Sequence, residues 1–139
     1  MKLILRIFIL ILFVKSTIFA GDFREIFKFS LKKDQQKKIL VKYANKEKLF
    51  EFRWTLYINE GLVTLSRYDG VVTQNLLYLN HKNQFFHIRL RDDGASFYNP
   101  PHFLLKFKAF DLKKREAKFE LYWYDPKMQT ELKFLKNKK

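Results

Sequence analysis

The residues best equipped to recognise a ligand in this sequence are cationic and aromatic. The chain carries 28 Lys and Arg against 14 Asp and Glu, a formal net charge of +14, and aromatic residues make up 18%. Cationic side chains pair with phosphates and carboxylates, and aromatic rings stack on cations and offer apolar contact area. There is no cysteine, which excludes disulfides, a thiol nucleophile and cysteine-ligated zinc. The composition therefore favours binding of an anionic partner over covalent catalysis.

Three segments place such residues at every second position. Within 49–58, 85–91 and 117–124, large apolar residues take one parity, and charged or aromatic residues take the other. This period of two is typical of strands with one buried face, so we expect the second parity to face solvent. The residues predicted to form a basic, aromatic binding face are Arg53, Tyr57, His87, Arg89, Arg91, Tyr122 and Tyr124, extended by Lys106 and Lys108.

A purely structural role for the same residues stays open. Lys and Arg protect solvent-facing strands from edge-to-edge aggregation, and Tyr packs across neighbouring strands.

Motifs for catalysis or metal binding are absent from the sequence. The four glycines do not form a phosphate-binding loop or a dinucleotide-binding turn, and there is no GxSxG or HExxH motif. His81, His87 and His102 lack the spacing of metal ligands. Asp92-Asp93-Gly94 is typical of a turn rather than of paired catalytic carboxylates. We therefore predict no enzymatic activity, no metal and no cofactor.

The N-terminus has the order of a secretory signal peptide. Lys2 and Arg6 precede an apolar run at 7–14, and Ala20 is the small residue before the expected cleavage site. Because Lys15 ends the run well short of the roughly 20 apolar residues that span a membrane, a cleaved signal over 1–20 is favoured over a retained anchor. A mature chain from Gly21 keeps 25 basic and 14 acidic residues, a net charge of +11.

Residues 21–139 are expected to form one all-β domain. Turn residues recur about every ten positions, as at Asn59-Glu60-Gly61, Asp69-Gly70 and Asp125-Pro126. We predict an antiparallel meander of about eight or nine strands, arranged as a sandwich or a small barrel. A strand is favoured within 35–47, with a short helix as the alternative, and residues 136–139 form a basic tail. Further strands are expected at 23–31, 62–68, 71–79, 102–110 and 129–135.

These features together predict an exported, non-enzymatic protein of a bacterial periplasm or cell envelope. Its partner would be anionic: a lipid headgroup, a cell-wall or lipopolysaccharide phosphate, or an acidic protein surface, with possible peripheral contact to the membrane. One alternative is a lipocalin-like carrier with an apolar cavity walled by Trp54, Phe107 and Trp123. A second alternative, single-stranded nucleic-acid binding, applies if the N-terminus is not a signal.

Overall fold

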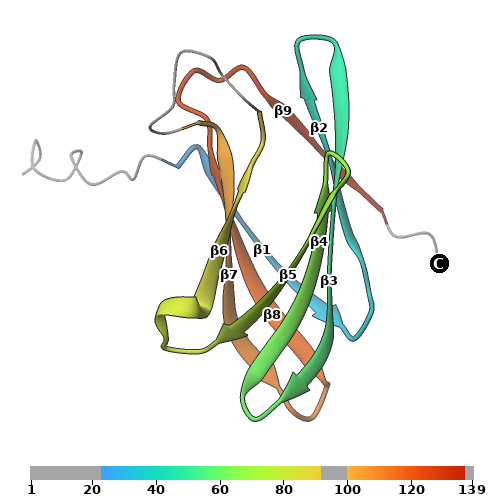
Figure 1. Cartoon of the computed structure of the whole chain (residues 1–139), viewed down its shortest axis with the longest axis vertical. Coiled ribbons are helices and arrows are strands. Elements are labelled where there is room, and N and C mark those ends of the chain that lie inside the picture. Colours follow the sequence, from blue (N-terminus) through green and yellow to red (C-terminus); the bar gives the residue numbers. More distant parts are fainter. Residues whose placement is uncertain (1–22, 92–99, 137–139) are drawn as a thin grey trace, which may run out of the picture.

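Alternating apolar and polar residues build two antiparallel β-sheets that face each other as the layers of an open sandwich (Figure 1). The computed structural model describes residues 23–91 and 100–136, which contain nine strands and one short 3-10 helix. The predicted signal peptide with its cleavage site, the turn at Asp92–Gly94 and the end of the basic tail lie outside the described residues. The all-β, antiparallel fold predicted from the sequence is confirmed, and the two separate sheets identify a sandwich.

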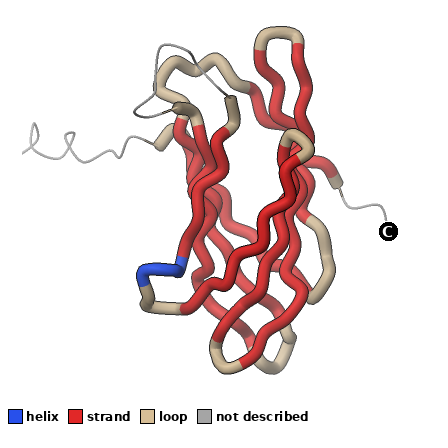
Figure 2. The backbone as a smooth tube through the Cα atoms, in the orientation of Figure 1, coloured by secondary structure: helices blue, strands red, loops and turns tan. Residues whose placement is uncertain are grey.

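The strands divide four and five between the sheets. The four-stranded sheet has the order β1 (Glu25–Lys32), β8 (Glu116–Tyr124), β7 (His102–Asp111) and β6 (Phe85–Arg89). The five-stranded sheet has the order β5 (Val71–Tyr78), β4 (Gly61–Tyr68), β3 (Lys46–Ile58), β2 (Lys37–Tyr43) and β9 (Glu131–Leu135). The 3-10 helix η1 (Lys82–Gln84), blue in Figure 2, connects β5 to β6.

Strands β2 to β5 and β6 to β8 follow the predicted meander, whereas β1 pairs with β8 and β9 pairs with β2. The segment 37–43 is a strand, as the sequence favoured, and not the alternative short helix.

Two-residue turns set the register of the meander. Asp69 and Gly70 join β4 to β5 with φ angles of 50° and 78°, and Asn59 and Glu60 join β3 to β4 with 49° and 64°. Turns with positive φ at both central positions match the right-handed twist of the flanking strands. Glycine suits position 70 because it adopts a positive φ without the steric clash of a Cβ atom.

Aromatic side chains fill the space between the sheets. Phe50, Phe52 and Trp54 on β3 are buried, and the Phe52 ring meets Phe119 of β8 edge-on, with centroids 4.9 Å apart. The Trp54 Nε1–H donates a 2.7 Å hydrogen bond to the Leu31 carbonyl of β1, so its polar atom is satisfied. Fully burying one such apolar side chain stabilises the fold by about 1.5–3 kcal/mol.

The alternation of β3 changes phase after Trp54, where a β-bulge shifts the pairing with β4 between Trp54 and Leu56. One extra residue in a strand reverses which side chains face the core. Leu56 and Ile58 consequently face solvent, and Tyr57 packs against the core. The prediction that Tyr57 faces outward is therefore wrong.

Candidate anion-binding face

The outer face of the four-stranded sheet collects most of the predicted binding residues. Six of the nine share it: His87 and Arg89 on β6, Lys106 and Lys108 on β7, and Tyr122 and Tyr124 on β8. Their neighbours of opposite parity, such as Phe103, Leu121 and Trp123, are in the core. We call this surface the outer basic face. It comprises these six residues together with Phe23, Lys28, Phe85, His102 and Glu120.

Aromatic rings form a strip across one end of the outer basic face. The His102 ring stacks on Tyr124 at a centroid distance of 4.9 Å and lies 5.1 Å from the ring of His87. Phe23, directly before β1, approaches Tyr122 edge-on at 5.2 Å. Since His102 is the register partner of Tyr124, the strip follows from the pairing of β7 with β8.

Lysines surround the Glu120 carboxylate at the centre of the face. Lys108 Nζ and Lys28 Nζ lie 3.6 and 4.0 Å from its oxygens, and Lys106 is its register partner on β7. The Tyr122 hydroxyl donates a 2.5 Å hydrogen bond to Glu120 Oε2. This bond and then the lysines hold the pKa of Glu120 below its usual value, while the bond raises the pKa of Tyr122 to about 12. One carboxylate among three lysines leaves this part of the face positive.

Partial burial lowers the pKa of His87 from its ordinary value, and the nearby His102 lowers it further. His87 is therefore neutral at pH 7, and its ring contributes contact area rather than charge. Arg89 and the lysines supply cationic charge to the face at this pH.

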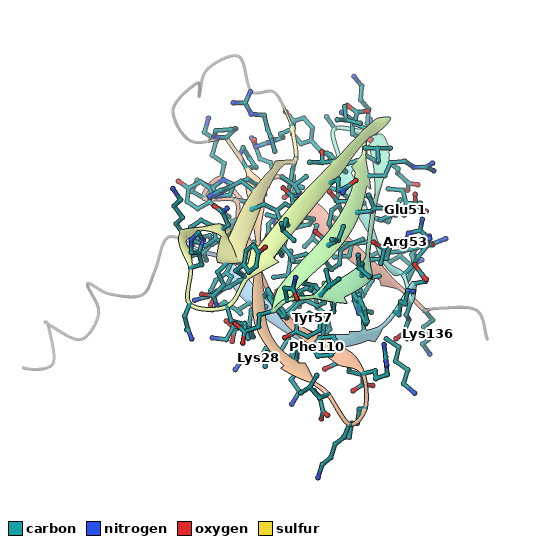
Figure 3. The ribbon with its side chains drawn as sticks, turned by 60° about the horizontal axis from the view of Figure 1, so that its bottom comes forward. Lys28, Glu51, Arg53, Tyr57, Phe110 and Lys136 are labelled. Atoms are coloured by element: carbon teal, nitrogen blue, oxygen red, sulfur yellow. The ribbon has the colours of Figure 1, made fainter. Side chains whose placement is uncertain are left out.

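Arg53 lies on the opposite side of the molecule. It belongs to the outer face of the five-stranded sheet, where its Nη1 atom is 3.9 Å from Asp34 Oδ1. Figure 3 shows Arg53 and Glu51 on the far side from Lys28. The same figure shows Tyr57 beside Phe110, with ring centroids 3.8 Å apart in a parallel stack. Arg53 and Tyr57 are thus outside the outer basic face.

Arg91 is buried rather than solvent-facing, with 5% of its surface exposed, so its predicted outward position is also wrong. The alternation that fits Phe85 to Arg89 ends with β6, and both Leu90 and Arg91 turn inward. The Arg91 guanidinium lies 3.9 Å above the Tyr43 ring and donates a 2.8 Å hydrogen bond to Gln129 Oε1. Its Nη2 atom lies 3.9 Å from Asp125 Oδ1.

Asp125 forms a buried polar cluster that the sequence did not reveal. Its Oδ2 atom accepts hydrogen bonds from the backbone N–H and the hydroxyl of Thr130. Arg24 approaches the same oxygen at 4.0 Å and lies 4.2 Å above the ring of Trp123. In the sequence, Asp125-Pro126 has only the signature of a turn, and its two arginine partners are distant along the chain. A structural role fits this cluster, because it ties β1, β8 and the start of β9 together.

Five members of the outer basic face were not predicted: Phe23, Lys28, Phe85, His102 and Glu120. His102 has the same parity as Leu104, Lys106 and Lys108 along β7, which is a signal that could have identified it. Phe23 begins the strand expected at 23–31 but precedes the observed β1, and its parity is that of the inward Phe27 and Phe29, so alternation alone would have placed it on the inner face.

A cleft of about 280 Å³ opens between the sheets where β5 and β6 face each other. Phe86, Ile88 and Leu90 line one wall and Tyr68 lines the other, and the cleft is also lined by charged side chains, those of Lys48, Asp69, Arg89 and Arg91. The Tyr68 hydroxyl crosses between the sheets to donate a 2.6 Å hydrogen bond to the Leu90 carbonyl. Trp54, Phe107 and Trp123, proposed above as cavity walls, are instead buried in the packed core.

Among residues 23–91 and 100–136, no three His, Asp or Glu side chains are grouped to hold a metal ion. No helix in that part of the chain is long and apolar enough to cross a membrane. Comparisons with protein-family models, curated proteins and solved structures find no match for this chain.

Proposed function

We propose that this chain is an exported, non-enzymatic envelope protein that binds an anionic surface through the outer basic face. The observation that carries the proposal is the gathering of Lys28, Lys106, Lys108 and Arg89 beside a strip of aromatic rings on one sheet. Among the anions of an envelope, phosphate-bearing lipid headgroups suit this combination best. Aromatic side chains favour the interface between headgroups and acyl chains, and each nearby Lys or Arg adds about 1 kcal/mol of attraction to an anionic membrane.

Vesicle co-sedimentation tests the proposal. The protein should sediment with vesicles containing phosphatidylglycerol and stay in solution with vesicles of phosphatidylcholine alone. The variant Lys106→Gln/Lys108→Gln should bind the anionic vesicles about tenfold or more weakly, since it loses two cations from the face.

The matched control removes the same charge from the other sheet. Arg53→Gln/Arg67→Gln neutralises two cations on the outer face of the five-stranded sheet, where Arg67 pairs with Glu51. This variant should bind nearly as well as the unmodified protein. Equal losses in the two variants would mean that the total charge of the protein, and not the outer basic face, drives binding.

Export has its own test. The denatured intact mass of the protein recovered from its host envelope should correspond to a chain that begins at Gly21. The mass of all 139 residues would contradict cleavage.

The cleft between β5 and β6 supports a second candidate function, the carriage of an apolar ligand. Phe86, Ile88 and Leu90 offer an apolar wall, and the cationic side chains of Lys48 and Arg89 line the same cleft. Native mass spectrometry with added fatty acid should then show a bound adduct that high salt does not remove. Ile88→Arg, which introduces a charge into that wall, should abolish the adduct and leave vesicle binding unchanged.

A further inference from the structure

Strand β5 ends the five-stranded sheet, with β4 as its one partner among the described strands. Along an edge strand, every second residue points its backbone N–H and C=O away from the sheet. These groups form a template on which a further strand can pair. The length of β5, eight residues from Val71 to Tyr78, is sufficient for a stable ladder.

The sequence of β5 lacks the usual protection of an edge. Natural edge strands carry Lys, other charges or Pro, which disfavour pairing with another molecule. The β5 sequence, VVTQNLLY, contains no charged residue and no proline, in a chain of which 30% is charged. The other edges of the two sheets do carry charges: Lys28 on β1, Arg89 on β6, and Glu131 and Lys133 on β9.

Apolar side chains are exposed on and beside this edge. Val72 is 64% exposed and Leu76 46% exposed on β5, and Leu56 and Ile58 on β3 are 47% and 55% exposed. The register aligns Leu56, Val63 and Leu76 in one row across β3, β4 and β5. A Cβ atom added to Gly61 would lie 3.0 Å from the Leu76 side chain, so this side chain lies over the glycine. The row forms a continuous apolar patch that reaches the edge.

We propose that β5 pairs antiparallel with β5 of a second copy of this chain, across a two-fold axis. A copy of the same chain fits because β5 provides an open edge on both sides of the axis at once. Two copies of a chain that keeps a net charge of +11 from Gly21 onward repel each other over most of their surfaces, and the uncharged β5 is a place where they can meet. In every register of this β5–β5 pair, an uncharged residue of one copy lies opposite an uncharged residue of the other. The two five-stranded sheets then join into one sheet of ten strands.

The oligomeric state in solution tests this pairing. Sedimentation velocity on the protein as its host produces it should show a dimer that dissociates on dilution. Leu76→Lys places two cations near the axis and should raise the dissociation constant by about tenfold or more. The matched control is Leu112→Lys. Leu112 is 75% exposed and lies between β7 and β8 of the four-stranded sheet, whereas β5 belongs to the five-stranded sheet, so this variant should leave the dimer intact.

Disulfide trapping provides a second measurement, which does not depend on how well Leu76→Lys folds. Because the chain has no cysteine, Gln74→Cys introduces one thiol near the middle of β5. Residues near the axis of an antiparallel pair come within the 4.4–6.8 Å Cα separation that a disulfide requires. Mild oxidation should yield a covalent dimer of Gln74→Cys and leave Leu112→Cys monomeric.

Three results would overturn the proposal. The first is a protein that stays monomeric at every concentration, and the second is a dimer that Leu76→Lys does not weaken while the two cysteine variants crosslink equally. The third is a monomer that binds an extended segment of a different protein through β5, which would assign the edge to another partner.

Discussion

Glu120 and Tyr122 show how one hydrogen bond fixes the charge of a surface residue. Both side chains project from the same face of β8, two positions apart, so the Tyr122 hydroxyl reaches the carboxylate within the strand. The bond and the nearby lysines favour the ionised carboxylate, and for the same reason they favour the neutral phenol. The pair therefore carries a charge of −1, with an ionised carboxylate and a neutral phenol, over a wider pH range than it would without the hydrogen bond.

We expect Tyr122→Phe to raise the pKa of Glu120 towards its ordinary value. A carboxyl group with a depressed pKa in the folded protein adds stability above its unfolded pKa of about 4.3, and this stability disappears as the pH falls through the folded-state pKa. The stability difference between the two proteins should be largest near neutral pH and vanish in acid. Urea denaturation at a series of pH values measures it. A difference that does not change with pH would exclude the hydrogen bond as its source.

Burial decides how much stability is lost when one member of an ion pair is removed. Lys48 Nζ lies 2.6 Å from Asp69 Oδ2, but both side chains are partly exposed, whereas Arg91 and Asp125 are 3.9 Å apart and almost fully buried. Breaking an exposed pair typically costs less than about 1 kcal/mol, and removing one member of a buried pair costs about 3–5 kcal/mol, because the remaining charge is desolvated.

Asp125→Ala should therefore destabilise the protein by about 3–5 kcal/mol and Lys48→Ala by less than about 1 kcal/mol. Equilibrium denaturation of the two variants under the same conditions measures both free energies of unfolding. Similar losses in the two variants would contradict the role of burial.

At the scale of the elements, sequence periodicity predicted the strands well and their irregularities poorly. Strand β8 keeps its alternation over its whole length, so Phe119, Leu121 and Trp123 face the core as the pattern indicates. Strand β3 looks equally regular in sequence, yet its bulge reverses Leu56 and Tyr57. The bulge places Tyr57 in a stack with Phe110 of β7. Because Phe110 is distant in the sequence, the periodicity of β3 does not predict this contact.

The same limit applies to the binding residues. His87, Arg89, Lys106, Tyr122 and Tyr124 lie on regular parts of their strands, and their shared face follows from parity once the strand order is known. Lys108 lies where the pairing of β7 with β8 shifts register, between Phe107 and Ala109, and is still exposed. Arg53 also has the expected parity but belongs to the other sheet. Parity assigns a side chain to the inner or outer face of a strand, and only the pairing of distant strands assigns that strand to a sheet.

The bulge in β3 makes a prediction that contradicts simple alternation. Leu56→Lys should change the free energy of unfolding by less than about 0.5 kcal/mol, because Leu56 faces solvent, whereas Tyr57→Ala should destabilise the protein by about 1–3 kcal/mol. Chemical denaturation at low protein concentration compares the two variants. The reverse order of effects would show that β3 runs without a bulge.

On the scale of the whole molecule, the chain ends complete both sheets. Strand β1 pairs with β8, in register pairs up to 98 residues apart such as Glu25 with Trp123, and β9 covers the edge of β2. The Phe27 and Phe134 rings meet at 4.4 Å, so the first and last strands also join the two layers. Each layer thus depends on strands from both ends of the sequence.

A chain that stops at Asp111 lacks β8 and β9 and should not fold. It would leave β1 without a partner in the four-stranded sheet and would expose the aromatic core of β3. Near-ultraviolet circular dichroism should show no fixed aromatic environment in this truncated chain, in contrast to the full-length protein. A native-like spectrum would show that β1 to β7 form an independent unit.

The pairing of β1 with β8 also governs when folding can finish. Contacts between residues this far apart in sequence close slowly, and β-sandwiches of such topology typically fold in milliseconds to seconds. During synthesis, β1 has no sheet to join until the chain from Glu116 onward has been made. The nascent protein therefore remains incompletely folded until synthesis is nearly over, which is the state that the export proposed above would require of a chain threaded through a secretion channel.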